Sequence, residues 1–309
     1  ARHARRTAQA ASPDPDAPDI GAEAGSPRVI APVPAARVKT DPAALRWGIV
    51  TTTNAPLPQI ARYAAYHLDL GAARLHLYLD APDPAAAAYL GAHPLIDVTV
   101  CDDAYWAAEG KARSDRHQLR QAYNATRSYR RSDLDWIAHI DVDEFLLADR
   151  PVAETLAAAG AAIAALRIHT AEQLSPAGGA PPDPAAPWHF KLPPGAAGQE
   201  KRVLEELYPT FGLHVRDGFV SHTTGKLFAR TGIAGTRLGI HALRLSGGTV
   251  SNLAQSDALR LGHAHAPGWE VFRDRLGFRM TKGSYRKKDA KGFCLEDVLA
   301  FLRESEGED

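Results

Sequence analysis

Short apolar runs alternate with helix-like segments through the first half of the chain. β-Rich runs occupy 47–50, 75–79, 96–101 and 136–140, and the segments between them predict helices over 58–70, 83–90 and 113–131. Strands that alternate with helices are joined by right-handed crossovers. The pattern therefore predicts an α/β fold, Rossmann-related, with a mostly parallel sheet flanked by helices.

Two boundaries divide the chain. Residues 1–44 hold seven of the 22 prolines and show no apolar periodicity, which predicts a disordered or loosely docked extension. Residues 45–309 are expected to form a single domain, regular over 45–150 and irregular over 151–309. The irregular half has glycine and proline concentrated in 176–198 and ends in a basic segment, an amphipathic helix near 295–303 and an acidic tail.

Composition narrows the partners and the compartment. The 36 basic residues balance 36 acidic ones, so no overall field favours nucleic acid as a partner. Cys101 and Cys294 are the only cysteines, too few for a disulfide framework, which favours a reducing cytoplasm. No apolar run approaches the roughly 20 residues that a membrane helix needs.

Polar residues follow three of the predicted strands. Asn54, Asp80 and Asp141 each come directly after a strand or within a few residues of its last apolar position, and Thr52 lies in the polar run before Asn54. Parallel α/β sheets bind ligands at the carboxyl ends of their strands. These side chains are therefore expected to face one crevice.

Asp141 and Asp143 are the candidate metal ligands. Two aspartates one residue apart project to the same side of an extended chain, where their repulsion favours a shared cation such as Mg²⁺ or Mn²⁺. The pattern also occurs at Asp14–Asp16 and Asp133–Asp135, but only Asp141 follows a buried-strand pattern. The alternative is an acidic turn that caps the next element.

The segment 136–146, Trp-Ile-Ala-His-Ile-Asp-Val-Asp-Glu-Phe-Leu, resembles the D-x-D-E-F signature of bacterial family-2-like glycosyltransferases of the GT-A fold. Looser similarities to that family lie at Tyr66-His67 with Gly71, at Gln118, Gln121, Tyr123 and Asn124, at Gly225-Lys226 with Arg230, and at 263–272. Together they cover roughly 47–285. The chain departs from the family at 53–55 and 80–84, so the nucleotide base of the donor stays open.

The resemblance implies which part of the chain would bind each substrate. Residues 45–150 would bind the nucleotide and 151–309 the acceptor. Asp141 and Asp143 would hold the metal, completed by a later histidine, since a neutral imidazole is a good Mn²⁺ ligand; His263 or His265 is favoured over His241. The expected donor contacts are Thr52, Asn54, Asp80, Gln118, Gln121, Lys226 and Arg286.

An inverting displacement, which the resemblance implies, needs a carboxylate to accept the proton of the attacking hydroxyl. Glu172, after the next apolar strand, is the first candidate and Asp217 the second. The alternative for either residue is an ordinary polar position at a strand end.

The basic run near the C-terminus has three interpretations: a loop that closes on a diphosphate, a solvated surface, and a contact with anionic lipid headgroups at the inner face of the membrane. Its members are Arg273, Arg275, Arg279, Lys282, Arg286, Lys287 and Lys288. The arginines of the long predicted helix are expected to be surface charges; they are Arg113, Arg116, Arg120 and Arg127.

These features together predict a metal-dependent transferase. It would move a sugar from a nucleotide-diphosphate donor, UDP-linked by resemblance, to a hydroxyl of a glycan or glycolipid. A nucleotidyltransferase is a second hypothesis, although residues 51–58 offer no glycine-rich phosphate loop. A non-catalytic sugar- or lipid-binding module is the third.

Overall fold

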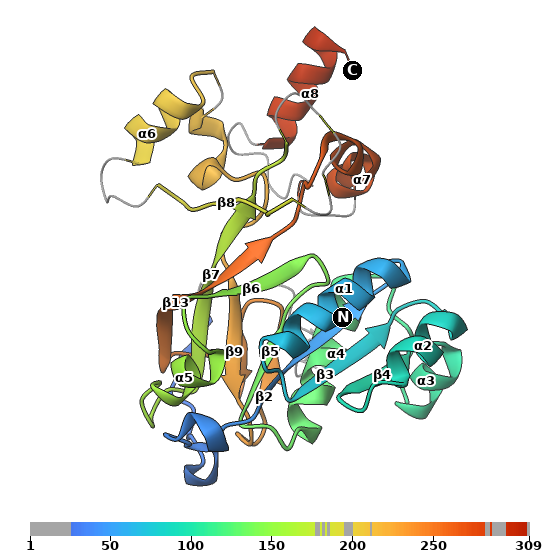
Figure 1. Ribbon diagram of the computed structural model, residues 1–309, viewed down its shortest axis with the longest axis vertical. Helices are drawn as coiled ribbons and strands as arrows, with labels where there is room; N and C mark the ends of the chain where they lie inside the picture. Colours follow the sequence, from blue (N-terminus) through green and yellow to red (C-terminus); the bar gives the residue numbers. More distant parts are fainter. Residues whose placement is uncertain are drawn as a thin grey trace, which may run out of the picture.

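The computed structural model describes residues 26–176, 180, 183, 186–194, 200–210, 212–281, 285 and 295–307. The chain is a mixed α/β protein in which helices flank a curled nine-stranded sheet (Figure 1). The strands of this sheet are β2 (Trp47–Thr53), β3 (Arg74–Leu79), β4 (Ile96–Val100), β5 (Trp136–His139), β6 (Glu144–Ala148), β7 (Ala165–Gln173), β8 (Phe190–Lys191), β9 (Lys226–Arg230) and β13 (Leu253–His263). The helices are α1 (Leu57–Asp69), α2 (Pro84–Gly91), α3 (Asp103–Ala108), α4 (His117–Arg131), α5 (Val152–Ala157), α6 (Glu200–Leu207), α7 (Trp269–Thr281) and α8 (Leu295–Glu306).

The first half follows the predicted alternation. Strands β4, β3, β2 and β5 lie side by side in that order and every neighbouring pair is parallel. Helix α1 joins β2 to β3, and α2 joins β3 to β4. Between β4 and β5 the chain makes two helices, α3 and α4, where the sequence predicted one long helix from 113.

The second half departs from the predicted parallel sheet. Strand β9 runs antiparallel to both β5 and β7, and β6 runs antiparallel to β13, so the sheet is mixed. Strand β6 runs in the opposite direction to β5 because only the turn 140–143 separates the two strands. A connection between parallel strands needs a dozen or more residues. In Figure 1, α6, α7 and α8 lie beyond the carboxyl ends of β7 and β13, opposite α5.

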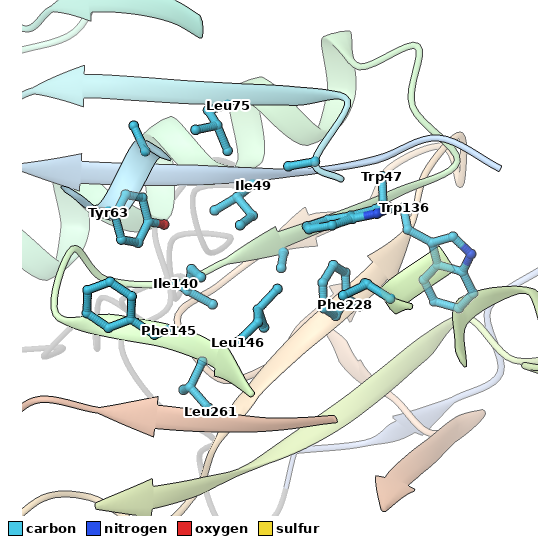
Figure 2. Close-up of a cluster of buried hydrophobic side chains, with 14 of the residues drawn as sticks. Trp47, Ile49, Tyr63, Leu75, Trp136, Ile140, Phe145, Leu146, Phe228 and Leu261 are labelled. Carbon is cyan, nitrogen blue, oxygen red and sulfur yellow. The ribbon is translucent and has the colours of Figure 1, made fainter. Parts of the chain in front are cut away.

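The period of two along β2 divides the core between the two faces of the sheet. Trp47 and Ile49 belong to the cluster that packs under α1, and Val50 to the cluster under α4. Phe228 of β9 meets Trp47 edge to face, with ring centroids 5.8 Å apart. Figure 2 shows both rings in this cluster. The same cluster continues to Tyr63, so one core spans both halves of the sheet.

Residues before β2 are docked on this body. Strand β1 (Arg28–Val29) pairs with β12 (Gly248–Val250) in a four-stranded sheet completed by β11 (Leu243–Leu245) and β10 (Arg237–Leu238). Asn252 bonds both backbone groups of Ala31. The remainder of the predicted extension, residues 1–25, lies outside the described residues. Within the described part of the chain, no helix has the length and apolar character needed to cross a membrane.

Gly225, just before β9, provides the first test of the fold. Its φ is +70°, and a β-carbon there would lie 2.1 Å from the Ile168 carbonyl oxygen. Gly247 has a similar φ of +78° with nothing within 4 Å, so it is a matched control. Gly247→Ala should cost about 1 kcal/mol of unfolding free energy, and Gly225→Ala about 2 to 5 kcal/mol. Equal losses in urea unfolding would contradict the close packing at Gly225.

His67 of α1 provides a pH-dependent test. Its Nδ1 donates to the Tyr63 carbonyl at 2.9 Å and its Nε2 accepts from the Leu146 amide at 3.3 Å, which defines a neutral ring. Burial lowers its pKa to about 4. As the pH falls, His67 takes up a proton in the unfolded chain at a higher pH than in the folded protein. The contribution of His67 to the free energy of unfolding is therefore complete above about pH 6.5 and is lost as the pH falls towards 4.

Replacing His67 should remove that pH dependence. Wild-type stability should fall between pH 6.5 and 4 by up to about 3 kcal/mol more than that of His67→Gln. His93→Gln, at an exposed histidine, is the control and should keep the wild-type pH profile. Parallel profiles of wild type and His67→Gln in urea unfolding would refute this role.

Candidate functional site

Five strands bring their ends to one edge of the sheet. Strands β5, β7 and β13 point the same way, so their carboxyl ends lie at this edge, while β9 and β6 run in reverse and begin there. The side chains that result come from Asp141, Glu172, Lys226, His263 and Glu144. In the sheet register His263 lies opposite Glu144 on one side and Glu172 on the other.

Asp141 and Asp143 lie in a tight turn. The Glu144 amide donates to the Asp141 carbonyl at 3.0 Å, and the Asp141 amide donates to the Glu144 carboxylate at 2.7 Å. The expectation that this segment is an extended chain is therefore wrong. The turn sends the two aspartates to different partners.

Lys226 holds the first of them. Its ammonium is 2.8 Å from the Asp141 carboxylate and 3.3 Å from that of Glu144, and the residue is only 1% exposed. Gln121 of α4 donates to the other Asp141 oxygen at 2.9 Å. Lys226 and Gln121, both predicted as donor contacts, thus bind a protein carboxylate in this structure.

For Lys226, Asp141 and Glu144, burial and the attraction of the opposite charge shift the pKa in opposite directions. Burial alone would lower the pKa of Lys226, but Asp141 and Glu144 outweigh it and raise the pKa. Burial would raise the pKa of Asp141, yet the Lys226 ammonium holds it well below its usual range. For Glu144 burial prevails over the attraction of Lys226 and raises the pKa to about 7.

Asp143 faces a different set of partners. Its carboxylate lies 3.9 Å from His263 Nε2 and 3.7 Å from the guanidinium of Arg275 on α7. The side chain is 19% exposed, so it is open to solvent. The structure thus brings together two of the four predicted metal ligands, Asp143 and His263.

The other two candidate histidines have partners of their own, although the His265 ring packs edge to face against His263 with centroids 5.0 Å apart. His265 Nε2 lies 2.7 Å from the Tyr285 hydroxyl, and burial holds its pKa far below the usual range. His241 donates from Nδ1 to the Gly225 carbonyl at 2.8 Å, so its Nε2 accepts from His222 Nε2 at 2.9 Å. Burial and the nearby Lys226 lower the pKa of His241 to about 3.

Glu172, the first candidate base, is buried. Its carboxylate accepts from the amides of Val220 and Ser221 at 3.2 and 2.6 Å and lies 3.1 Å from the Lys191 ammonium. The same ammonium donates to the Gly218 carbonyl at 2.6 Å. In this arrangement Glu172 ties the loop 218–221 to the sheet.

Asp217, the second candidate base, lies next to that anchored loop. It is half-buried and has left-handed backbone angles, φ 56° and ψ 15°. Such a conformation is uncommon for a residue other than glycine and is found at functional positions more often than elsewhere.

Asp80 and Arg120 form an ion pair at the neighbouring strand end. Arg120 Nε donates to Asp80 Oδ1 at 2.7 Å, and a second guanidinium nitrogen contacts the other carboxylate oxygen. Arg113 donates to the Asp80 carbonyl at 3.1 Å. The prediction that Arg120 is a surface charge is wrong, because the residue is 7% exposed and satisfies a carboxylate.

The remaining donor candidates differ in accessibility. Asn54 is exposed beyond the end of β2, and Gln118 is partly exposed in the first turn of α4. Thr52 is buried and accepts from the Asn124 amide at 3.1 Å. Arg286 lies outside the described residues, as do Lys282, Lys287 and Lys288 of the predicted basic run.

Three participants were not predicted as site residues. Glu144 was noted only as part of the signature, although its spacing of three from Asp141 is that of a turn closed by a side chain. Lys191 is remote in sequence from Glu172, and only strand pairing between β8 and β7 brings it near. His222 likewise reaches His241 through a loop that has no periodicity.

The described residues contain no group of three or more His, Cys, Asp or Glu side chains arranged to hold a metal ion. Comparison with known proteins adds no assignment: no family model matches the chain, and no characterised protein matches it in sequence.

The ion-paired lysine generates a stability prediction. Lys226→Met keeps most of the side chain but leaves the partly exposed Asp141 carboxylate and the buried Glu144 carboxyl group without their cation. The change should cost about 3 to 5 kcal/mol in urea unfolding. Adding Glu144→Gln should recover part of the loss, since one of those charges is removed.

Arg46→Met is the control for that experiment. Arg46 forms an exposed ion pair with Asp133 at 2.8 Å, which should contribute less than about 1 kcal/mol. Similar losses in the Lys226 and Arg46 variants would show that the buried lysine is not a special anchor.

Proposed function

We propose that the protein is a metal-dependent glycosyltransferase of the GT-A type, which moves a sugar from a nucleotide-diphosphate donor, such as a UDP-sugar, to a hydroxyl of a glycan or glycolipid. The observation that carries the proposal is the pairing of Asp143 with His263 beside the Asp141–Lys226 clamp. This pairing occurs at the carboxyl edge of the sheet, where α/β folds bind ligands.

The donor set fits a hard divalent ion completed by substrate. Asp143 Oδ2 and His263 Nε2 are 3.9 Å apart, too far for a direct hydrogen bond but close enough for one ion to contact both. With so few protein ligands, diphosphate oxygens and water would complete the coordination of Mg²⁺ or Mn²⁺. Such an ion neutralises charge on the departing diphosphate.

Asp141 contributes as an anchored carboxylate. Lys226 and Gln121 each bind one of its oxygens, and each oxygen retains a lone pair for a further contact. The side chain is 31% exposed, so that contact can come from the solvent side. A carboxylate held in this way is pre-organised for the ion.

The neighbouring strand ends would bind the rest of the donor. Asn54 is exposed just after β2, and Gln118 is partly exposed in the first turn of α4. Arg275 of α7 faces Asp143 and would stabilise negative charge on the leaving diphosphate. Asp80 would act through Arg120, because its carboxylate is already paired.

Of the two candidate bases, Asp217 is the more exposed. Glu172 is buried and already has three donors on its carboxylate, so its role is to position the loop 218–221. Asp217 lies at the edge of that loop and is half-buried. An acceptor hydroxyl placed there would lose its proton to Asp217.

Donor hydrolysis tests the proposal. With Mn²⁺ present the wild type should hydrolyse one of a panel of nucleotide sugars slowly, and Asp143→Asn should reduce that rate at least about 100-fold, since it removes a charged ligand of the ion. Released nucleoside diphosphate is the readout.

Asp133→Asn is the matched control, because Asp133 belongs to another D-x-D pair and its carboxylate forms an exposed ion pair with Arg46. It should keep the wild-type rate. Metal-independent sugar binding with no hydrolysis of any donor, or hydrolysis that survives Asp143→Asn, would refute the transferase proposal.

A further inference from the structure

A pocket lies beside the end of helix α6, between β8 and the segments 207–210 and 215–220. Its volume is about 400 Å³, which is within the range of pockets that bind small molecules. The residues that give its wall an apolar or aromatic surface are Leu207, Tyr208, Pro209, Val215 and Val220. Leu207 is 62% exposed and Tyr208 is 36% exposed, so the rim presents large apolar side chains to solvent.

The charge in the wall is already balanced by the protein. Among the described residues of the wall, Lys191 carries the single charge. Its ammonium group has three hydrogens to donate, and three acceptors surround it: the Glu172 carboxylate at 3.1 Å, the Gly218 carbonyl at 2.6 Å and the Tyr208 hydroxyl at 3.2 Å. The Lys191–Glu172 pair is neutral, so the wall does not select for an anionic ligand.

Backbone groups of the wall are engaged as well. The Val220 amide donates to Glu172 at 3.2 Å, and the Gly218 amide donates to the Val215 carbonyl at 2.9 Å. The amide and the carbonyl of Tyr208 both take part in backbone hydrogen bonds. A sugar ring in this pocket would need partners for several hydroxyl groups, each of which costs free energy when it is buried without one. A hydrocarbon group needs no such partner.

Close packing between Gly218 and α6 fixes the shape of the pocket. Gly218 has a φ of +71°, and a β-carbon there would lie 2.9 Å from Leu204 Cδ2 and 3.2 Å from Tyr208 Cε2. Leu204 belongs to α6 and is buried. Glu172 holds the loop 218–221 from the other side through two backbone amides. The wall is therefore formed before a ligand binds, which reduces the entropy lost on binding.

A row of paired strand residues connects the pocket with the proposed metal site. Lys191 is the register partner of Glu172, and Glu172 is the register partner of His263. Two strand spacings therefore separate Lys191 from His263, about 10 Å across the sheet. His263 Nε2 lies 3.9 Å from Asp143, and the proposed base Asp217 directly precedes a residue of the wall. A molecule with an apolar part in the pocket would thus hold its polar end towards the transfer site.

We propose that this pocket binds the hydrocarbon chain of a neutral glycolipid acceptor, whose hydroxyl end lies at the Lys191–Glu172 pair. The inference rests on the proposed transferase function and narrows its acceptor to a glycolipid. A free glycan has no apolar group that would fill the pocket and release water from its wall. Glu205 and Glu206 are exposed just before the rim residue Leu207, and their charge disfavours an anionic head group.

Octyl glucoside below its micelle-forming concentration is the probe, and methyl glucoside is the matched probe without a chain. Each is titrated calorimetrically into the full chain in EDTA, with no nucleotide sugar present. Octyl glucoside should bind at least about 100-fold more tightly than methyl glucoside, with a negative heat-capacity change. Across hexyl, heptyl and octyl glucosides the affinity should rise about twofold to fourfold for each methylene group.

Two variants at exposed positions test the location of the chain. Leu207→Glu places a charge at the rim and should weaken the binding of octyl glucoside at least about 10-fold. Thr210→Trp should also weaken it, because the larger side chain occupies the space between the walls. Leu95→Glu, at an exposed leucine outside the wall, is the control and should keep the wild-type affinity. Urea unfolding checks that each variant is folded.

Three outcomes of the binding experiment would overturn the assignment of the pocket to a hydrocarbon chain. They are equal affinity for octyl and methyl glucoside, an equal loss of affinity in Leu95→Glu and Leu207→Glu, and tighter binding of phenyl glucoside than of octyl glucoside. None of these measurements depends on the metal or the donor, whereas donor hydrolysis needs no acceptor. The two proposals can therefore fail separately.

Donor hydrolysis then tests whether the bound chain belongs to an acceptor. In Mn²⁺, with a donor that the protein hydrolyses, saturating octyl glucoside should change the rate at which nucleoside diphosphate is released, and Leu207→Glu should reduce that effect. An unchanged rate at saturation would place the pocket away from the transfer site and overturn the acceptor role. Chain-dependent binding with no hydrolysis of any donor would refute the acceptor role together with the transferase proposal.

Discussion

Lys226 carries a positive charge at a position that is 1% exposed, and the two carboxylates that balance it come from a turn 85 residues earlier in the sequence. A buried ammonium requires such partners, because its desolvation is costly. The lysine begins β9, whose neighbours are β5 and β7. The pairing therefore joins the turn after β5 to the middle of the sheet.

The same ion group explains the geometry of the D-x-D segment. Glu144 accepts from the Asp141 amide and also contacts Lys226, so the turn and the ion pair stabilise each other. Asp143 is left to face His263 and Arg275 at the open side. The main contacts of Asp141 are thus with other residues of the protein, whereas Asp143 lies on the side from which a ligand could approach.

The balanced charge of the whole chain does not describe its distribution in space. At the carboxyl edge of the sheet, Asp141 and Glu144 contact the buried Lys226, and the buried Glu172 contacts Lys191. The charged groups of this edge are therefore paired with one another by residues that lie far apart in the sequence.

By itself the sequence determined the alternation of strands and helices in the first half of the fold and the place of Asp141 after a strand, because local periodicity records helices, strands and the residues at their ends. The expected helix at 58–70 and strand at 75–79 match α1 and β3 within a residue. Only the tertiary structure decided the antiparallel position of β9, the pairing of Arg120 with Asp80 and the burial of Glu172. Those features depend on contacts between residues far apart in the chain, and the energy of burying a charge is set by the partner that folding brings to it.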